Sequence, residues 1–276
     1  MIIAQKLNIA IQGYEGCFHQ IVAHRFFGTN ITTTPCDTFR EVARKVKSGE
    51  VDFGVMAIEN SIAGSIIANY GILQDEDVQV MGEMYLPIVQ NLMVLPGVTL
   101  DEITEVETHP MALLQCVEYL DTHPEWRLVE SEDTAVSAKR IAEQGCRHKA
   151  AIASELAAQL YGLEIVAPNI NTIKNNYTRF MVLKRRDNKM APDANKASLY
   201  FKAEDRPGAL IEALGCFADV NMTKLQSYPV PSEPWHYMFH IDLEFDSLDK
   251  YFENLKRLQA ATEEVHVYGV YHNGLN

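Results

Sequence analysis

The chain has 276 residues, of which 47% are hydrophobic and 22% are charged, with 15 glycines and 11 prolines. This composition is that of a globular protein with one large or two ordinary domains, and it excludes collagen-like and low-complexity chains. The 24 lysines and arginines against 37 aspartates and glutamates give a net charge of −13. That excess argues against nucleic-acid binding and against an anionic membrane surface, both of which need a basic stripe.

The cysteine content and the N-terminus predict a cytoplasmic protein. The five cysteines form no CxxC pair, which argues against a secreted disulfide framework and a zinc site and favours reduced thiols. The N-terminus lacks the basic start and long apolar core of a signal peptide. No apolar run reaches the roughly 18 residues that a membrane span needs.

The first part of the chain alternates strand-like and helix-like segments. A capping box at Thr38 and Glu41 begins a predicted helix that Gly49 ends. Further helices are expected at residues 111–120, 135–142 and 154–161, and strands at residues 7–12, 51–58, 89–95, 104–107, 150–153, 164–167 and 177–183. This alternation predicts an α/β fold with a mainly parallel sheet.

A second, smaller unit follows a change in composition. Residues 185–196 are polar without apolar periodicity, which is typical of a linker. The expected elements beyond them are a strand at 197–203, a helix opened by Pro207 and Gly208, two strands, a second helix and a final strand at 265–270. The order βαββαβ within about 80 residues is the ferredoxin-like split βαβ motif.

Polar clusters follow several of the expected strands at their carboxyl ends, the edge at which open α/β sheets bind ligands. The clusters are residues 13–16, 59–61 and 108–110. Ordinary turn chemistry is the alternative for each, because Gly, Asn and Ser also dominate turns. In the second cluster Asn60 or Ser61 would then cap a helix, whereas a binding role would use the donor and acceptor of the Asn60 amide.

The third cluster precedes a predicted helix that has Pro110 in its first turn. Thr108 or His109 would then lie beside free backbone N–H groups, where an anion binds readily. Because histidine titrates near neutrality, His109 is a candidate general acid, with a local hydrogen bond before Pro110 as the alternative. Gln115 lies within the same helix, and a solvent-facing position is the alternative to a binding role.

The stretch Asn-Tyr-Thr-Arg-Phe at residues 176–180 begins the last strand of the first part. Alternate side chains of a strand share a face, so Thr178 and Phe180 should point one way and Arg179 the other. An ordinary strand with Arg179 at the surface is the alternative to a functional role. Thr178 and Arg179 can serve one pocket only if regular pleating fails locally.

These stretches, in this order and over nearly the whole chain, resemble the prephenate dehydratase family. The family's Gly-Pro-x-Gly-Thr-Phe-Ser-like opening corresponds to residues 13–19, where the two glycines and Phe18 match. Its Pro-Ile-Glu-Asn-Ser-x-x-Gly and Ser/Thr-His-Pro stretches correspond to residues 57–64 and 108–116. Its Asn-x-Thr-Arg-Phe signature is intact at 176–180.

The second unit resembles an ACT domain, the small-molecule sensor that follows the catalytic part in this family. The resemblance implies that Gly208, Ala209, Leu210 and Asn221 bind an effector, which in the family is L-phenylalanine. Where the family has Glu-Ser-Arg-Pro, this chain has Gln-Ser-Tyr-Pro at residues 226–229. With both charged side chains replaced, a unit that only holds an oligomer together is the alternative, because fold alone does not imply a ligand.

The resemblance implies a two-lobed α/β catalytic domain like that of type II periplasmic binding proteins, followed by the ACT domain. The corresponding boundaries are a catalytic domain at 1–184, a linker at 185–196 and an ACT domain at 197–276. From ACT pairing we expect a homodimer or a homotetramer.

The implied reaction is the decarboxylating dehydration of prephenate to phenylpyruvate, water and CO2 in L-phenylalanine biosynthesis, which is a carbon–oxygen lyase activity without cofactor or metal. By resemblance Thr178 is the catalytic residue, because a donor must reach the ring hydroxyl as it leaves. The substrate-binding residues are then Asn60, Ser61, Thr108, Gln115 and Arg179. Arg179 is expected either to hold the pyruvyl carboxylate or to act structurally, since gripping the departing carboxylate would oppose the reaction.

Four other functions are alternatives to prephenate dehydration. Arogenate dehydratase acts on the aminated analogue of prephenate, and the sequence does not say which residue reads the side-chain end of the substrate. A non-catalytic amino-acid-binding regulator is opposed by the intact signature at 176–180, and a periplasmic solute-binding protein by the lack of a signal peptide. Fusion to chorismate mutase would need an added helical segment, for which a first strand at residue 7 leaves no room.

Overall fold

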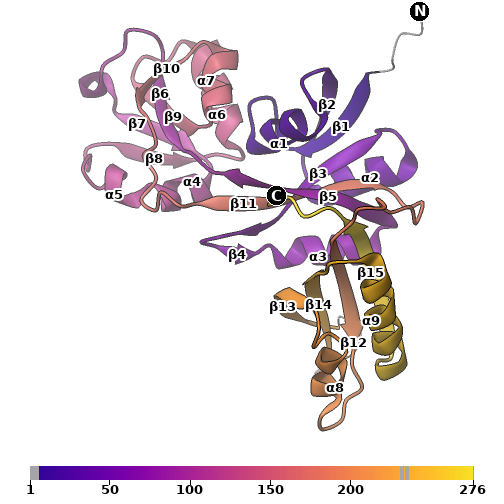
Figure 1. Cartoon of the computed structure of the whole chain (residues 1–276). Helices are drawn as coiled ribbons and strands as arrows, with labels where there is room; N and C mark the ends of the chain where they lie inside the picture. The colour runs from indigo at the N-terminus through magenta and orange to yellow at the C-terminus, as the bar shows by residue number, and fades with distance from the viewer. Residues whose placement is uncertain (1–5, 231–232, 234–235, 276) are drawn as a thin grey trace, which may run out of the picture.

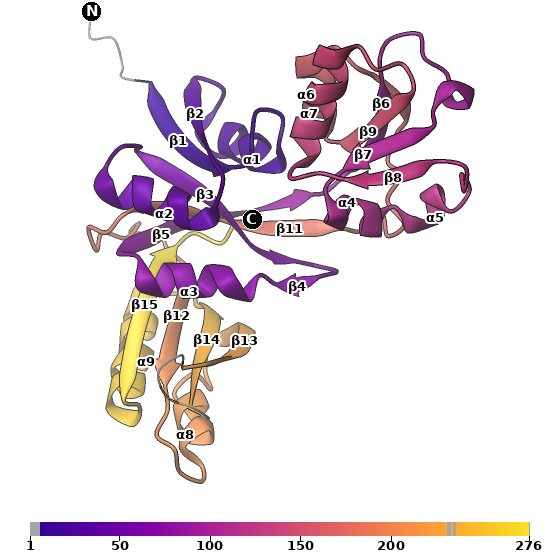
Figure 2. The same ribbon diagram turned by 180° about the vertical axis from the view of Figure 1, so that it is seen from behind.

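The computed structural model describes residues 6–230, 233 and 236–275, and arranges them around three β-sheets (Figure 1). Two sheets form the two lobes of a larger α/β unit, and the third forms a smaller C-terminal unit. In both views the C-terminal unit extends from the first lobe, away from the second lobe (Figures 1 and 2). Within this part of the chain, no helix is both long enough and apolar enough to cross a membrane.

The first lobe is built on a mixed sheet with the strand order β2-β1-β3-β11-β5, to which β4 adds by pairing with β3. Strands β1, β2 and β3 are parallel, whereas β11 runs antiparallel to both β3 and β5. The elements of this lobe are β1 (Leu7–Gln12), α1 (Phe18–Phe27), β2 (Ile31–Cys36), α2 (Phe39–Ser48), β3 (Phe53–Asn60), β4 (Gly64–Ser65), α3 (Ile67–Asp75), β5 (Val78–Pro87) and β11 (Tyr177–Arg185).

Helix α2 shows why the local sequence forms this structure. The Thr38 hydroxyl accepts from the Glu41 N–H at 3.1 Å, and the Glu41 carboxylate accepts from the Asp37 N–H at 3.0 Å. Gly49 ends the helix with φ of +77°, a left-handed conformation that glycine adopts without a Cβ penalty. The predicted helix between these residues is therefore confirmed.

The second lobe has the strand order β10-β6-β9-β7-β8. Strand β7 is parallel to β8 and β9, and β6 is antiparallel to β9 and β10. The chain enters this lobe from β5 and returns to the first lobe in β11. Its elements are β6 (Asn91–Val94), η1 (Leu100–Glu102), β7 (Glu105–Thr108), α4 (Pro110–Gln115), α5 (Val117–Leu120), β8 (Arg127–Glu130), α6 (Thr134–Gln144), β9 (Lys149–Ala153), α7 (Glu155–Tyr161) and β10 (Glu164–Ala167).

The expectation of a mainly parallel sheet was wrong. Because β11 comes back from the second lobe, it enters the first sheet against the direction of its neighbours β3 and β5. All seven strands expected in the first part are confirmed, as β1, β3, β6, β7, β9, β10 and β11. The elements that were not predicted are β2, β4, β5, β8, α1 and α3. The single helix expected at 111–120 is broken at Cys116 into α4 and α5.

The C-terminal unit has the predicted βαββαβ order, with the strands arranged as β13-β14-β12-β15. Its elements are β12 (Lys196–Lys202), α8 (Ala209–Gly215), β13 (Asn221–Pro229), β14 (Tyr237–Glu244), α9 (Leu248–Ala261) and β15 (Glu264–Tyr271). All six predicted elements are therefore confirmed.

The C-terminal unit shares a hydrophobic core with the first lobe. Tyr200, Tyr268 and Tyr271 pack in one buried cluster with Tyr70 of α3 and Val80 of β5. At Gly269 an added Cβ would lie 2.0 Å from the Val80 carbonyl oxygen. Only glycine permits this approach, so β15 and β5 are in direct backbone contact.

Candidate active site

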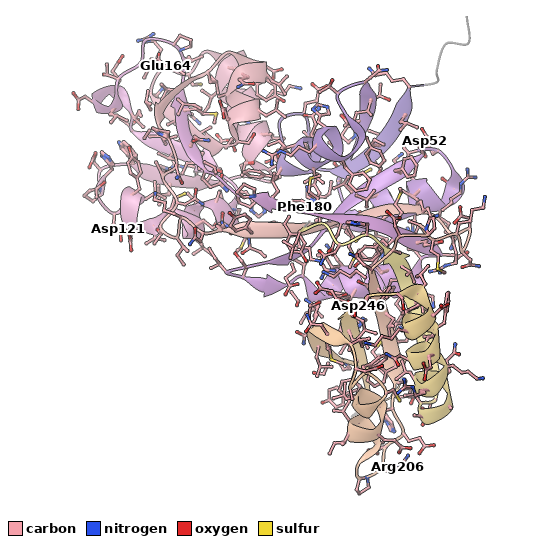
Figure 3. The ribbon with its side chains drawn as sticks, in the orientation of Figure 1. Asp52, Asp121, Glu164, Phe180, Arg206 and Asp246 are labelled. Carbon is pink, nitrogen blue, oxygen red and sulfur yellow. The ribbon has the colours of Figure 1, made fainter. Side chains whose placement is uncertain are left out.

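A cavity of about 470 Å³ lies between the two lobes. Its wall comes from the end of β1 and the start of α1, the β3–β4 hairpin, the crossing from β5 to β6, helix α4, the start of α6 and the first residues of β11. Phe180 on β11, labelled in Figure 3, is part of this wall and lies at the junction of the lobes. Segments far apart in the chain therefore meet around one space.

Thr178 and Asn60 face each other in this wall, on the neighbouring strands β11 and β3. The Asn60 Nδ2 donates to the Thr178 hydroxyl oxygen at 3.0 Å and to the Asn176 Oδ1 at 2.7 Å. The Asn60 Oδ1 accepts from two backbone N–H groups, those of Ile62 and Ala63. The amide is thereby fixed, and the Thr178 oxygen acts as an acceptor, which leaves its own proton to be donated.

Gln115 and Gln90 form a second polar pair in the wall. The Gln90 Nε2 donates to the Gln115 Oε1 at 3.2 Å. Gln90 is 3% exposed, and its Oε1 has no hydrogen-bond partner among the residues that the structure describes. Because a buried polar atom without a partner is costly, this oxygen is suited to accept from a ligand.

Two histidines contribute to the wall in different ways. His109 is the N-cap residue of α4, and its Nδ1 accepts from the Met111 N–H at 3.2 Å, so the predicted local hydrogen bond is present. This bond places any proton of a neutral His109 on Nε2. His19 is buried and accepts from the Ala57 N–H, and burial lowers its pKa to about 3, so it is neutral.

Asp133 brings a carboxyl group into the wall. It is the N-cap residue of α6, and its Oδ1 accepts from the N–H groups of Ala135 at 2.8 Å and Val136 at 3.1 Å. Burial raises the pKa of Asp133, although these two hydrogen bonds act in the opposite direction. Glu132 also borders the cavity but pairs outward with Arg140 at 2.8 Å.

Cys17 also lines the cavity. It is 3% exposed, and its thiol points at the Gln12 carbonyl oxygen at 3.6 Å. Burial raises the Cys17 pKa to about 12, and the neighbouring Asp133 acts in the same direction. At neutral pH this thiol is protonated and is therefore a poor nucleophile.

Three of the predicted site residues line the cavity, namely Thr178, Asn60 and Gln115. Ser61 and Thr108 do not. The Ser61 hydroxyl accepts from the Tyr177 N–H at 2.9 Å, and no helix begins at Ser61, because the chain forms β4 first. Thr108 is fully buried and donates to the Ile152 carbonyl oxygen at 2.6 Å.

Arg179 also lies outside the cavity wall, because regular pleating holds in β11 and directs it to the opposite face from Thr178 and Phe180. It is 4% exposed, and its Nε donates to the Glu83 carboxylate at 2.7 Å. Its Nη1 pairs with Asp242 and its Nη2 donates to the Tyr271 hydroxyl at 3.1 Å. Arg179 thus joins β11 to the C-terminal unit, which agrees with the structural alternative and not with a carboxylate clamp.

The predicted effector residues lie at opposite ends of the C-terminal unit, with Asn221 at the end next to the first lobe, and they do not border a common cavity. Gly208 caps α8 with φ of +86°, followed by Ala209 and Leu210. Leu210 borders a cavity of about 130 Å³, whereas Asn221 borders another of about 360 Å³ with Asp219 and Glu244.

Sequence reasoning missed several wall residues, above all Gln90, Asp133 and Ser65. The signal for Asp133 was present, since an Asp directly before the predicted helix at 135–142 is a typical N-cap. Gln90 lies inside a strand-like run and carried no signal.

The fold and the site together define a class: a two-lobed α/β protein that encloses a small molecule between its lobes and offers it a hydroxyl and two amides. The prephenate dehydratase family model matches residues 9–188. The chain belongs to this family, as its sequence stretches predicted.

Two relatives extend the similarity beyond the matched region. The bifunctional chorismate mutase/prephenate dehydratase of Aquifex aeolicus (strain VF5) is 34% identical over 277 residues, covering 99% of this chain and 75% of the relative. The chloroplastic arogenate dehydratase/prephenate dehydratase 2 of Arabidopsis thaliana is 34% identical over 283 residues, covering 96% and 73%.

Two solved structures are similar over nearly the whole chain. The prephenate dehydratase of Arthrobacter aurescens in complex with L-Phe has a TM-score of 0.87 and 28% identity, covering 97% of this chain and 90% of that one. A protein described as a novel type of quorum-quenching acylase has a TM-score of 0.86 and 31% identity, covering 96% and 98%. The same fold therefore accompanies two described activities.

Proposed function

We propose that the chain catalyses the decarboxylating dehydration of prephenate to phenylpyruvate, water and CO2, as a carbon–oxygen lyase. The observation that carries the proposal is the Thr178 hydroxyl in the cavity between the lobes, held as an acceptor by the Asn60 amide at 3.0 Å. A hydroxyl in this arrangement donates its proton outward, toward a substrate oxygen.

The chemistry requires two bonds of prephenate to break. The ring carbon–carboxylate bond breaks and its electron pair enters the ring, while the ring C–O bond opposite breaks and its pair leaves with the oxygen. One proton converts the leaving hydroxide to water, so that prephenate and a proton give phenylpyruvate, CO2 and water. Thr178 donates to the oxygen as charge develops on it, which is where a preorganised donor lowers the barrier most.

The departing carboxylate needs a different environment from the leaving hydroxyl. Its charge moves into the ring during the reaction, so tight binding of that carboxylate would stabilise the substrate more than the transition state. Ile66, Ile88 and Phe180 supply apolar surface in the same wall. We assign the departing carboxylate to this apolar side, where loss of its charge is favoured.

Gln115 and Gln90 are assigned to the orientation of the substrate. The unpartnered Gln90 Oε1 accepts from a substrate hydroxyl, and the Gln115 Nε2 donates to a substrate oxygen. Asn60 acts on Thr178 and is therefore a positioning residue.

Turnover of prephenate by the purified protein at neutral pH tests the proposal, with phenylpyruvate formation as the readout. The Thr178→Ala variant should lose turnover by roughly 10²- to 10⁴-fold, the usual contribution of a positioned proton donor. Thr178→Ser keeps the hydroxyl and serves as the matched control, with activity within about tenfold of the unchanged protein. Full activity of Thr178→Ala in a folded protein removes Thr178 from the mechanism.

Arogenate is the second candidate substrate, and Asp133 is the observation in its favour. Arogenate carries an ammonium group where prephenate carries a keto group, and an ionised Asp133 in the wall would attract it. The relative in Arabidopsis is named for both activities. Parallel assays with the two substrates at equal concentration separate these candidates.

An acylase activity, as described for the similar structure, could not use the Cys17 thiol as its nucleophile, and we therefore rank it below prephenate dehydration. The Cys17 pKa of about 12 leaves almost no thiolate at neutral pH. If the protein hydrolyses an N-acyl amide faster than it converts prephenate, acylase becomes the preferred activity.

The remaining assignments follow the family. We assign a catalytic domain at 1–184, a linker at 185–196 and an ACT domain at 197–276, supported by the family match at 9–188. L-phenylalanine is the proposed effector, since the Arthrobacter aurescens relative was solved with it. A homodimer or homotetramer in the cytoplasm is also proposed, and the five unpaired cysteines support a reducing compartment.

A further inference from the structure

We propose that Lys224 of the C-terminal unit completes the substrate site, because its ammonium group polarises the Ser65 hydroxyl to bind a substrate carboxylate. This inference rests on the proposed function for the identity of the substrate. It assigns to the C-terminal unit a part in the catalytic pocket itself, and it makes Lys224 a positioning residue and Ser65 a substrate-binding residue.

Lys224 reaches the first lobe from β13. Its Nζ donates to the Ser65 Oγ at 2.7 Å and pairs with the Glu59 Oε2 at 2.9 Å. The side chain is only 8% exposed, and the Nζ lies 5.3 Å from the centre of the Tyr70 ring. These contacts bring β13 of the C-terminal unit up to β4 of the first lobe, the two strands shown in Figures 1 and 2.

The two partners of Lys224 are directly opposite each other in the β3–β4 hairpin. Glu59 pairs with Ser65, and the next pair is Asn60 with Gly64. One buried ammonium group therefore holds both strands at the base of the hairpin. Since Asn60 donates to the Thr178 hydroxyl, the contact lies one residue from the pair that the dehydration uses.

The cavity wall contains no positively charged lysine or arginine side chain of its own among the described residues. It does contain the carboxyl groups of Glu132 and Asp133. A substrate with two carboxylates needs at least one strong donor for the carboxylate that stays on the product. Within the part of the chain that the structure describes, two cations touch wall residues. Arg140 pairs with the Glu132 carboxylate, whereas Lys224 donates to the Ser65 hydroxyl, whose own proton is free to be donated to a ligand.

Ser65 is suited to relay this charge. Its oxygen accepts from the ammonium group, so its own O–H is directed elsewhere, and no acceptor for it is found among the described residues. A hydroxyl that accepts from a cation is a stronger donor, because hydrogen bonds in a chain polarise one another. The Ser65 O–H therefore supplies a charge-assisted donor to the product-side carboxylate without placing a cation in the cavity.

A double-mutant cycle of Lys224→Met and Ser65→Ala tests the relay. Methionine keeps the buried stem of the lysine and removes the charge. Each single variant should raise the KM for prephenate about tenfold, or 1.4 kcal/mol, while kcat changes less than about threefold. The double variant should be no worse than either single variant, because the two residues act as one unit.

Two further variants control the experiment. Lys224→Arg keeps the cation and should stay within about threefold of the unchanged protein. Lys202→Met removes a similarly buried lysine of the same unit, which pairs with Glu233 at 2.7 Å and Glu263 at 3.1 Å, and should leave KM unchanged. Thermal unfolding of each variant separates loss of fold from loss of binding.

Binding of phenylpyruvate, measured by calorimetry, gives the same comparison without turnover. Weaker binding in Lys224→Met and Ser65→Ala supports the relay even if the unchanged protein proves inactive on prephenate, which would overturn the proposed function alone. Unchanged KM and unchanged phenylpyruvate binding in Lys224→Met, or additive effects in the double variant, overturn the relay.

Discussion

Replacement of Arg179 by lysine distinguishes a residue that binds substrate from one that joins two parts of the fold. The guanidinium is 4% exposed and is hydrogen-bonded to three buried side chains, Glu83, Asp242 and Tyr271. Its Nη1 also lies 3.8 Å from the Glu59 carboxylate. Lysine keeps the positive charge but offers a single ammonium group, which cannot match the fork-shaped geometry of these three acceptors.

The expected loss can be worked out from these contacts. An ammonium group placed near the carboxylates keeps one strong pairing and gives up two of the three contacts, one of them to a carboxylate that is almost fully buried. Hydrogen bonds to charged groups are worth about 1.5–3 kcal/mol each, so we expect a destabilisation of roughly 3 kcal/mol. For a chain of this size that corresponds to a fall in the unfolding temperature of about 6–12 °C.

Thermal unfolding and steady-state kinetics, measured side by side, check this prediction. At a temperature where both proteins are folded, Arg179→Lys should keep a KM for prephenate within about twofold of the unchanged value. Arg140→Lys is the matched control, because Arg140 likewise pairs with carboxylates, those of Glu107 and Glu132, but has a side chain that is 36% exposed. This replacement should cost less than about 1 kcal/mol. A raised KM with an unchanged unfolding temperature would refute the structural role of Arg179 and restore the carboxylate clamp.

Three other predictions follow from the titratable groups. Asp133→Asn removes the carboxyl group that could pair with the ammonium group of arogenate, so the ratio of kcat/KM for prephenate over that for arogenate should rise about fivefold or more. An unchanged ratio would show that Asp133 does not distinguish the two substrates. Burial alone would raise the pKa of Asp242, but the charge and hydrogen bond of Arg179 and a hydrogen bond from Ser198 hold this pKa below its usual 3.8. A depressed pKa adds stability above about pH 4, and this stability is lost as the pH falls through the folded value. Asp242→Asn should therefore flatten the acid limb of the pH–stability curve. Cys17→Ala should retain prephenate turnover within about threefold, as the protonated thiol takes no part in the reaction, and a larger loss measured in the folded variant would contradict this.

Much of the fold was predictable because the local signals agree with the tertiary structure. The capping box before α2, the Asp and Ser caps of α6 and α7, and the βαββαβ order of the C-terminal unit all appear as written in the sequence. The missed elements lack such signals. Strand β2 has Pro35 near its end, and α3 has neither a side-chain cap nor a basic residue in its last turn.

The antiparallel entry of β11 was not predictable from local pattern, since it depends on where the chain goes between β5 and β11. The pattern of strands and helices is the same whether the last strand returns parallel or antiparallel. The same long excursion decides which polar residues meet, and so the pairing of Gln90 with Gln115 could not be read from the sequence.

Cavity residues could be predicted where they belong to a short family stretch. They could not be predicted where burial determines whether a polar side chain faces the cavity or the core. Asn60, Gln115 and Thr178 were identified through their family stretches, and all three line the cavity. Thr108 belongs to the same kind of stretch but is used inside the second lobe, where its hydroxyl satisfies the Ile152 carbonyl. A polar residue in a family stretch can thus form a structural hydrogen bond instead of contacting a ligand. Only its hydrogen-bond partners in the structure show which of these two roles it has.

Strand β11 explains why Thr178 and Arg179 stand next to each other without sharing a pocket. Because side chains alternate across a strand, one residue faces the cavity between the lobes and the next faces the C-terminal unit. The β3–β4 hairpin is used in the same way, with Asn60 directed to Thr178 and its neighbour Glu59 paired with Lys224. The adjacent strands β3 and β11 therefore each carry one residue that faces the cavity and one residue that is bonded to the C-terminal unit, so the backbone of both strands links the cavity wall to that unit.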